Sequence, residues 1–199
     1  MEAIKPRQSA PSRQKSPIER YLERESKSEK KHEFLNGKIR KMPGSSYNHN
    51  KIAANFIISI GQSILDKNLP FEVISSDQKI YIPQLHQVLY PDALIVYEKP
   101  EFWNHRKDVL LNPILIVEIL SPSTEGYDRT TKFMSYKHIP SFKEYVMVNQ
   151  DKPEIETWFR EEPHLWRETV YTDEKGVLDL KAVGIQVSMD KIYKNIEFS

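Results

Sequence analysis

The stretch NPILIVEILSPST, residues 112–124, places one carboxylate, Glu118, inside a run of aliphatic residues. Such a run predicts a strand that is buried on both faces. An ionised carboxylate is costly in a dry core unless it is paired or binds a metal. The run ends just after Glu118, at Ser121-Pro122. We therefore expect Glu118 to lie where the end of this strand opens into a cleft.

A second carboxylate, Asp92, follows Pro91 at the start of the apolar stretch YPDALIVYE. Taken alone, Asp92 is better explained as a turn residue at the beginning of a strand. If the two strands are neighbours, however, Asp92 and Glu118 meet at one point. Two carboxylates and water suit a hard cation such as Mg²⁺ or Mn²⁺. Such an ion can activate water and stabilise charge on a phosphate under attack.

The segment EGYDRTTKFMSYKHI, which follows, is predicted to form a helix that stops at Pro140. Asp128 and Lys132 are four residues apart and share a face of this helix, which the loop SPSTEGY can aim at the carboxylates. A lysine there could stabilise developing negative charge. The alternative is an ordinary helix ion pair, worth about 0.2–0.5 kcal/mol. Residues 126–143 carry four basic side chains against one acidic side chain, which indicates either a phosphate-binding face or a solvated one.

The elements that must position these residues form an alternating pattern. Residues 1–16 are predicted to be a disordered basic tail rich in Pro and Ser, and Ser16-Pro17 is typical of a helix start. Asn36-Gly37 predicts a hairpin turn. The longest predicted helix carries an apolar stripe on NHNKIAANFIISIGQSILDKN. Strands are predicted for FEVISSDQKIYIP, YPDALIVYE, PILIVEIL, EYVMVN, EIETWFR, LWRETVY and AVGIQVSM.

This order predicts an α/β fold: a mixed β-sheet flanked by two main helices, with antiparallel strands at the C-terminal end. The chain has 199 residues, which fits a single domain over residues 17–199. It has no Cys and no apolar run near the roughly 18–20 residues of a membrane span. We therefore expect a cytoplasmic protein without a membrane partner. The net charge of +1 gives no global nucleic-acid signal.

The residues YPD and NPILIVEILSPSTEGYDRTTKFMSYKHIPSFKEYVMV, together with SEKKHEFLNGKIRKMPGSSYNHNKIAANF upstream, resemble the Uma2 family of restriction endonuclease-like proteins, also called DUF820. The resemblance covers roughly residues 18–195 and implies a PD-(D/E)XK nuclease fold. It makes Asp92 and Glu118 the ligands of Mg²⁺ or Mn²⁺. Glu33 would approach the same metal or orient its water, and Lys132 would be the catalytic lysine.

One position departs from the wider superfamily pattern, which places the lysine two residues after the Glu, where this chain has Leu120. The family resembles branches in which the lysine comes from the next helix, so Lys132 can substitute. Asp128 could hold Lys132 in place. His49, at the start of the long helix, is either a polar helix-start residue or a group near the scissile phosphate.

The resulting hypothesis is a metal-dependent endonuclease that hydrolyses DNA. Cutting both strands of a duplex requires two sites, so a homodimer is expected. Two alternatives stay open: a nucleic-acid- or protein-binding module that kept the fold without efficient catalysis, and a hydrolase of another phosphorylated substrate.

Overall fold

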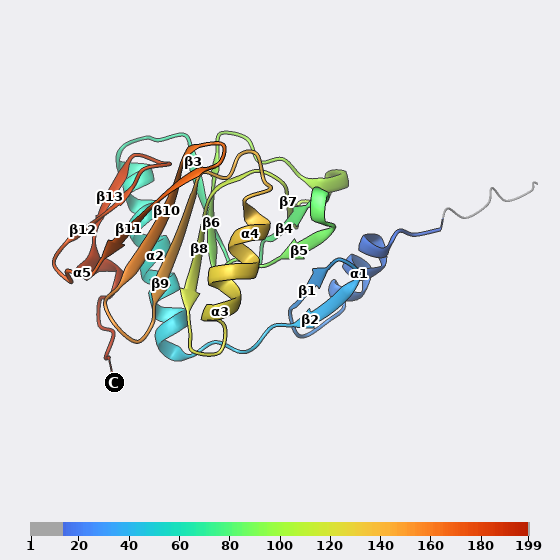
Figure 1. The fold of residues 1–199 in the computed structure, drawn as a ribbon, viewed down its shortest axis with the longest axis horizontal. Helices are drawn as coiled ribbons and strands as arrows, with labels where there is room; N and C mark the ends of the chain where they lie inside the picture. Colours follow the sequence, from blue (N-terminus) through green and yellow to red (C-terminus); the bar gives the residue numbers. More distant parts are fainter. Residues whose placement is uncertain (1–13, 199) are drawn as a thin grey trace, which may run out of the picture.

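The computed structural model describes residues 14–198. All but the last three residues of the predicted tail, residues 1–16, lie outside this range. A six-stranded mixed sheet forms the centre of the molecule (Figure 1), in the order β11-β10-β9-β8-β6-β3. Its strands are β3 (Phe71–Ser75), β6 (Ala93–Tyr97), β8 (Pro113–Leu120), β9 (Glu144–Asn149), β10 (Ile155–Glu162) and β11 (Leu165–Tyr171). Only β8 and β9 pair in parallel, and the other neighbours are antiparallel.

One face of this sheet is covered by α2 (Tyr47–Asp66). The predicted apolar stripe is confirmed, because Ile52, Phe56, Ile60 and Ile64 are all buried in the same core cluster as the sheet. The side chain of Ser46 accepts a hydrogen bond from the amide of His49 and so caps the helix. The cap fixes where the helix begins, and the Ser46 hydroxyl also donates a hydrogen bond of 2.8 Å to Gln150, the residue after β9.

The other face is covered by the second predicted helix, which runs continuously from α3 (Glu125–Tyr127) through η3 (Asp128–Lys132) into α4 (Phe133–Tyr136). The middle part, η3, is a wide turn of π-helix, a local feature that helical periodicity does not predict. Phe133 and Tyr136 pack with Ile116 and Leu120 of β8. The two main helices therefore lie on opposite faces of β8, as the α/β prediction required (Figure 1).

A second sheet, in the order β2-β1-β5-β4-β7, lies beside the first (Figure 1). Its strands are β1 (His32–Leu35), β2 (Lys38–Lys41), β4 (Lys79–Ile82), β5 (Gln87–Leu89) and β7 (Val109–Leu110). α1 (Pro17–Glu25) packs against it and begins with the Ser16 cap, which confirms the predicted helix start. Asn36 and Gly37 both have positive φ, as the hairpin turn between β1 and β2 requires.

Several sequence predictions were wrong in detail. The segment FEVISSDQKIYIP is not one strand, because the chain turns after Ser75 and divides it between β3 and β4, which belong to different sheets. Strict alternation puts Ile114 on the same face as Glu118, yet Ile114 packs on the α2 face, since the register of β8 against β6 shifts at this point. Pattern reading also overlooked β5 and β12 (Val177–Leu180).

The C-terminal end forms the antiparallel pair β12 and β13 (Ile185–Ser188), followed by α5 (Met189–Ile192). Only β13 lies within the predicted strand AVGIQVSM, which is shorter than predicted, and the pair packs next to α2. Two short 3₁₀ turns complete the elements, η1 (Pro83–Leu85) and η2 (Trp103–His105). No helix of the described residues is long and apolar enough to cross a membrane.

Candidate active site

Strand pairing brings the first two predicted site residues together. β6 and β8 are antiparallel neighbours with Ala93 opposite Val117, so the start of β6 lies beside the end of β8. The amide of Asp92 donates to the carbonyl of Val117 at 3.1 Å. The Asp92 carboxylate in turn accepts a hydrogen bond of 2.7 Å from the amide of Ile119. Asp92 is therefore attached to the backbone on either side of Glu118.

Glu118 is 2 % exposed, so its carboxylate is buried as the sequence suggested. One oxygen, Oε2, lies 2.9 Å from the ammonium nitrogen of Lys132, and the other, Oε1, accepts a hydrogen bond of 3.0 Å from the hydroxyl of Tyr136. Both partners come from the helix that follows β8. The buried carboxylate is thus paired by residues that are at most 18 positions later in the chain.

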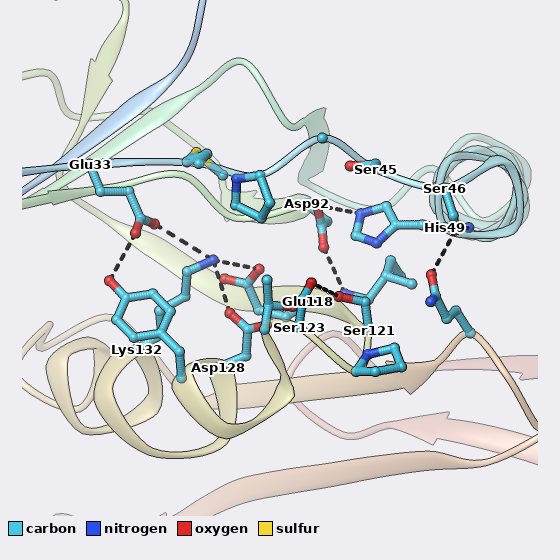
Figure 2. Close-up of a pocket in the computed structure, with 18 of the residues that line it drawn as sticks. Glu33, Ser45, Ser46, His49, Asp92, Glu118, Ser121, Ser123, Asp128 and Lys132 are labelled. Atoms are coloured by element: carbon cyan, nitrogen blue, oxygen red, sulfur yellow. Dashed lines mark hydrogen bonds and ion pairs between the residues drawn. The ribbon is translucent and has the colours of Figure 1, made fainter.

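Lys132 is the centre of the charged cluster (Figure 2). Its ammonium nitrogen lies 2.9 Å from Glu118, 3.2 Å from Asp128 and 3.7 Å from Glu33. It also donates to the carbonyl of Tyr90 at 3.2 Å. Lys132 and Asp128 form the helix ion pair that their spacing allowed, but their side chains are 5 % and 4 % exposed, so the pair is part of a buried cluster.

The proximity of these groups perturbs their protonation. Burial raises the pKa of Glu118 well above its ordinary value, and the charge of Lys132 only partly opposes this. Burial alone would lower the pKa of Lys132, but the carboxylates of Glu118, Glu33 and Asp128 outweigh it and raise that pKa. Burial also works against ionisation of Asp92, yet hydrogen bonding and charge from His49 lower its pKa. Asp92 is therefore held ionised, and Lys132 is held as a cation.

Glu33 reaches this cluster from the second sheet. It lies on β1 and is 1 % exposed. Its Oε2 accepts a hydrogen bond of 2.8 Å from the hydroxyl of Tyr127, and Arg40 lies 3.5 Å from the same oxygen. The residue is more than 50 positions from any other carboxylate of the cluster in sequence, so only the packing of one sheet beside the other places it near Lys132.

His49 lies on the first turn of α2 and contacts the site directly. Its Nε2 is 3.0 Å from Oδ1 of Asp92 (Figure 2). His49 is thus a polar residue at the helix start whose side chain also contacts Asp92, and a place near the scissile phosphate stays a prediction. With Ile119 on one oxygen and His49 on the other, both oxygens of Asp92 have hydrogen-bonding partners.

These side chains line one cavity of about 270 Å³. It contains all six predicted site residues: Glu33, His49, Asp92, Glu118, Asp128 and Lys132. Arg40 and Tyr127 also line the cavity, and Tyr136 contacts Glu118, although the sequence did not single out any of the three. The spacing of Tyr136, four residues after Lys132 on the same helix, was a signal that could have indicated its contact with Glu118.

Few of the cations in the basic segment 126–143 are free to meet a phosphate. Lys132 is buried in the cluster, and Arg129 forms an ion pair with Glu156. The ammonium of Lys137 lies 4.1 Å from the ring centre of Phe133. Of the four Lys and Arg residues in this segment, only Lys143 is both exposed and without an ion pair to another described residue. Most of this segment's charge is therefore used within the fold.

The carboxylates of the cavity are the candidate ligands for a divalent cation. Among residues 14–198, no three His, Cys, Asp or Glu side chains converge as a ready-made metal site. Mg²⁺, however, is commonly held by one or two carboxylates with water and substrate phosphates in the remaining positions. Asp92 and Glu118 are hard oxygen donors, come from adjacent strands and line the same cavity. The two residues fit that kind of site, provided that Glu118 exchanges its present partners for the ion.

The protein is similar to known proteins in fold and in sequence. The protein resembles a solved structure of a "putative nuclease belonging to DUF820" from Anabaena variabilis, with a TM-score of 0.69 and 14% identity over 90% of this chain and 98% of that one. Two Synechocystis proteins are similar in sequence. The protein designated slr1290 is 33% identical over 96% of this chain and 97% of its own length, and sll1609 is 30% identical over 83% and 92%. The model of Uma2, described as "Putative restriction endonuclease", matches residues 18–190. The family model thus matches most of this chain, and the two relatives are 30% and 33% identical to it. The chain therefore belongs to the Uma2 family.

Proposed function

We propose that this protein is a metal-dependent endonuclease that hydrolyses phosphodiester bonds in DNA. Its family and its nuclease-like fold support a nuclease. The observation that carries the finer proposal is the contact of Lys132 with Glu118, beside Asp92, in one cavity. Two carboxylates on neighbouring strands and a buried ammonium supply both signs of charge that phosphodiester hydrolysis uses.

In this proposal Asp92 and Glu118 hold Mg²⁺ or Mn²⁺. When bound, such an ion lowers the pKa of water and offsets negative charge on the phosphate. Tyr136 and the amide of Ile119 orient the two carboxylates, since each donates a hydrogen bond to one of them. His49 keeps Asp92 ionised and correctly turned through the contact at Oδ1.

Lys132 would act on the phosphate itself. Its ammonium group is fixed by carboxylates, so it is charged and already oriented before substrate enters. A preorganised cation stabilises the oxygens that gain charge in the transition state. Asp128 and Glu33 position Lys132, and Glu33 is also close enough to that ammonium to orient a water molecule in the same cavity. We propose a homodimer, because two such sites are needed to cut both strands.

The test is a nicking and cleavage assay on supercoiled plasmid with Mg²⁺, Mn²⁺ or EDTA. We expect Asp92→Asn and Glu118→Gln to lower metal-dependent cutting at least about 100-fold, which is the scale of losing one preorganised electrostatic group. Lys132→Met is expected to do the same. Glu72→Gln, an exposed carboxylate on β3, is the matched control and should cut normally. Light scattering after gel filtration measures the proposed dimer.

The second candidate is a binding module without efficient catalysis. It is favoured by the partners that occupy both oxygens of Glu118 and by the lack of a preformed three-ligand metal site among residues 14–198. Wild-type protein that binds DNA but does not cut it with either metal would support this module and refute the nuclease. Hydrolysis of a phosphomonoester without plasmid cutting would instead indicate a different phosphorylated substrate.

A further inference from the structure

The hairpin of β1 and β2 and the two residues before it, together residues 30–41 and called the N-terminal hairpin below, carry basic side chains that the proposed chemistry does not use. A second cavity, of about 550 Å³, is lined by Lys30, Lys31 and Lys41. It shares His49 and Asp92 with the first cavity, together with the 42–45 segment that connects β2 to α2. In Figure 1 this connecting segment runs from β2 across to the start of α2. The basic cavity therefore lies directly beside the candidate active site.

The charges in this second cavity are mostly free to meet a ligand. Lys30 and Lys41 are exposed, and no carboxylate of residues 14–198 forms an ion pair with either. Lys31 is partly occupied, because its ammonium lies 2.7 Å from Asp77 and 3.1 Å from the hydroxyl of Ser76. Two lysines are thus available as unpaired cations beside the candidate active site, with Lys31 as a weaker third.

Arg40 extends this row of cations into the first cavity. Its guanidinium carbon lies 3.5 Å from the ring centre of Tyr127, which stacks the planar group in a fixed orientation. Glu33 is opposite Arg40 in the strand register, but the contact between them is long, at 3.5 Å. The Arg40 side chain is 37% exposed. A fixed, half-exposed guanidinium retains N–H donors suited to a phosphate.

We propose that the hairpin binds the sugar–phosphate backbone of the DNA on one side of the scissile bond. Arg40 contacts the phosphate nearest the carboxylates, and Lys30 and Lys41 contact the phosphates beyond it. This inference rests on the proposed nuclease function. It assigns binding of the DNA backbone to the N-terminal hairpin rather than to residues 126–143. Backbone contacts of this kind position a duplex without reading its sequence.

The test measures binding separately from cutting. The affinity of a short fluorescent DNA duplex is determined by anisotropy in EDTA, over a range of KCl concentrations. We expect the double variant Lys30→Ala/Lys41→Ala to bind roughly tenfold more weakly or worse, and the slope of log K against log salt to fall by about 2. The charge-matched control Lys143→Ala/Lys175→Ala, at two exposed lysines elsewhere, should bind like the wild type.

Equal binding by the wild type and the hairpin variant, or an equal loss in the control, would overturn the proposal. So would a wild type that does not bind the duplex. Thermal melting of each variant verifies folding, which these exposed substitutions should not disturb. The two proposals fail differently. DNA binding that depends on the hairpin, without cutting, would refute the nuclease function but support DNA binding by the hairpin. Cutting by a protein whose DNA binding does not depend on the hairpin would support the nuclease function but refute DNA binding by the hairpin.

Discussion

Replacement of Lys132 by Met is the sharpest test of the charged cluster. The substitution keeps an unbranched chain of similar length but removes an ammonium that lies within 4.0 Å of three buried carboxylates. Among the described residues, Glu33 alone of the three keeps another cation in that range, Arg40 at 3.5 Å. With Glu118 ionised and an effective dielectric constant of about 20, the two charges 2.9 Å apart attract with roughly 6 kcal/mol, although the raised pKa of Glu118 shows that burial opposes this charged form. Desolvation and repulsion among the carboxylates offset much of this attraction.

We therefore expect Lys132→Met to lower the free energy of unfolding by about 3–5 kcal/mol, the usual result of removing one partner of a buried ion pair. Urea unfolding in EDTA, followed by circular dichroism, measures this change. Lys79→Met is the matched control, since Lys79 is also buried but faces one carboxylate, Asp108, which is half exposed. The loss in this control should be clearly smaller.

A double-mutant cycle with Glu118→Gln tests whether the two residues act as a pair. If they do, the double variant loses less stability than the two single variants together, with a coupling of about 1–3 kcal/mol. Single effects that simply add, or a Lys132→Met protein as stable as the wild type, would refute this account of the electrostatics. If Lys132→Met is as stable as the wild type, a loss of cutting in this variant is a direct effect on catalysis.

Two further predictions concern stability outside the cluster. Burial raises the pKa of Glu144 from 4.5 to about 7, so its neutral form stabilises the fold fully below pH 4.5, and about 3 kcal/mol is lost as pH rises through 7. Urea unfolding across this range should show a flatter profile for Glu144→Gln, and an unchanged slope would contradict the assignment. Glu25 accepts hydrogen bonds from the amide of His32 and the hydroxyl of Tyr90. Glu25→Ala should therefore cost about 1–3 kcal/mol in the same assay, whereas exposed Glu23→Ala should cost little.

The sequence by itself determined the parts of this protein that depend on local patterns. The apolar run around Glu118 predicted a buried strand with an unusual carboxylate, and the period of Ile52, Phe56, Ile60 and Ile64 predicted the buried face of α2. The spacing of Asp128 and Lys132 predicted that they share a helix face. Each of these signals lies within a few residues, where backbone geometry fixes the direction of side chains.

The tertiary structure alone decided which of these patterns meet. The pairing of β6 with β8 places Asp92 beside the end of β8 that carries Glu118. The packing of the second sheet places Glu33 near Lys132. Neither follows from periodicity, because alternation gives the face of a strand but not its neighbour. The division of FEVISSDQKIYIP between two sheets has the same origin.

Burial also decided how the charges are used. A basic composition at residues 126–143 could not reveal that Lys132 is enclosed by carboxylates and Arg129 is paired with Glu156. Nor could it reveal that Arg40 is stacked on Tyr127 at the edge of the cavity. The sequence shows which residues are charged but not what they contact. The partner of a charged side chain and its exposure to water are set by packing between segments that are distant along the chain.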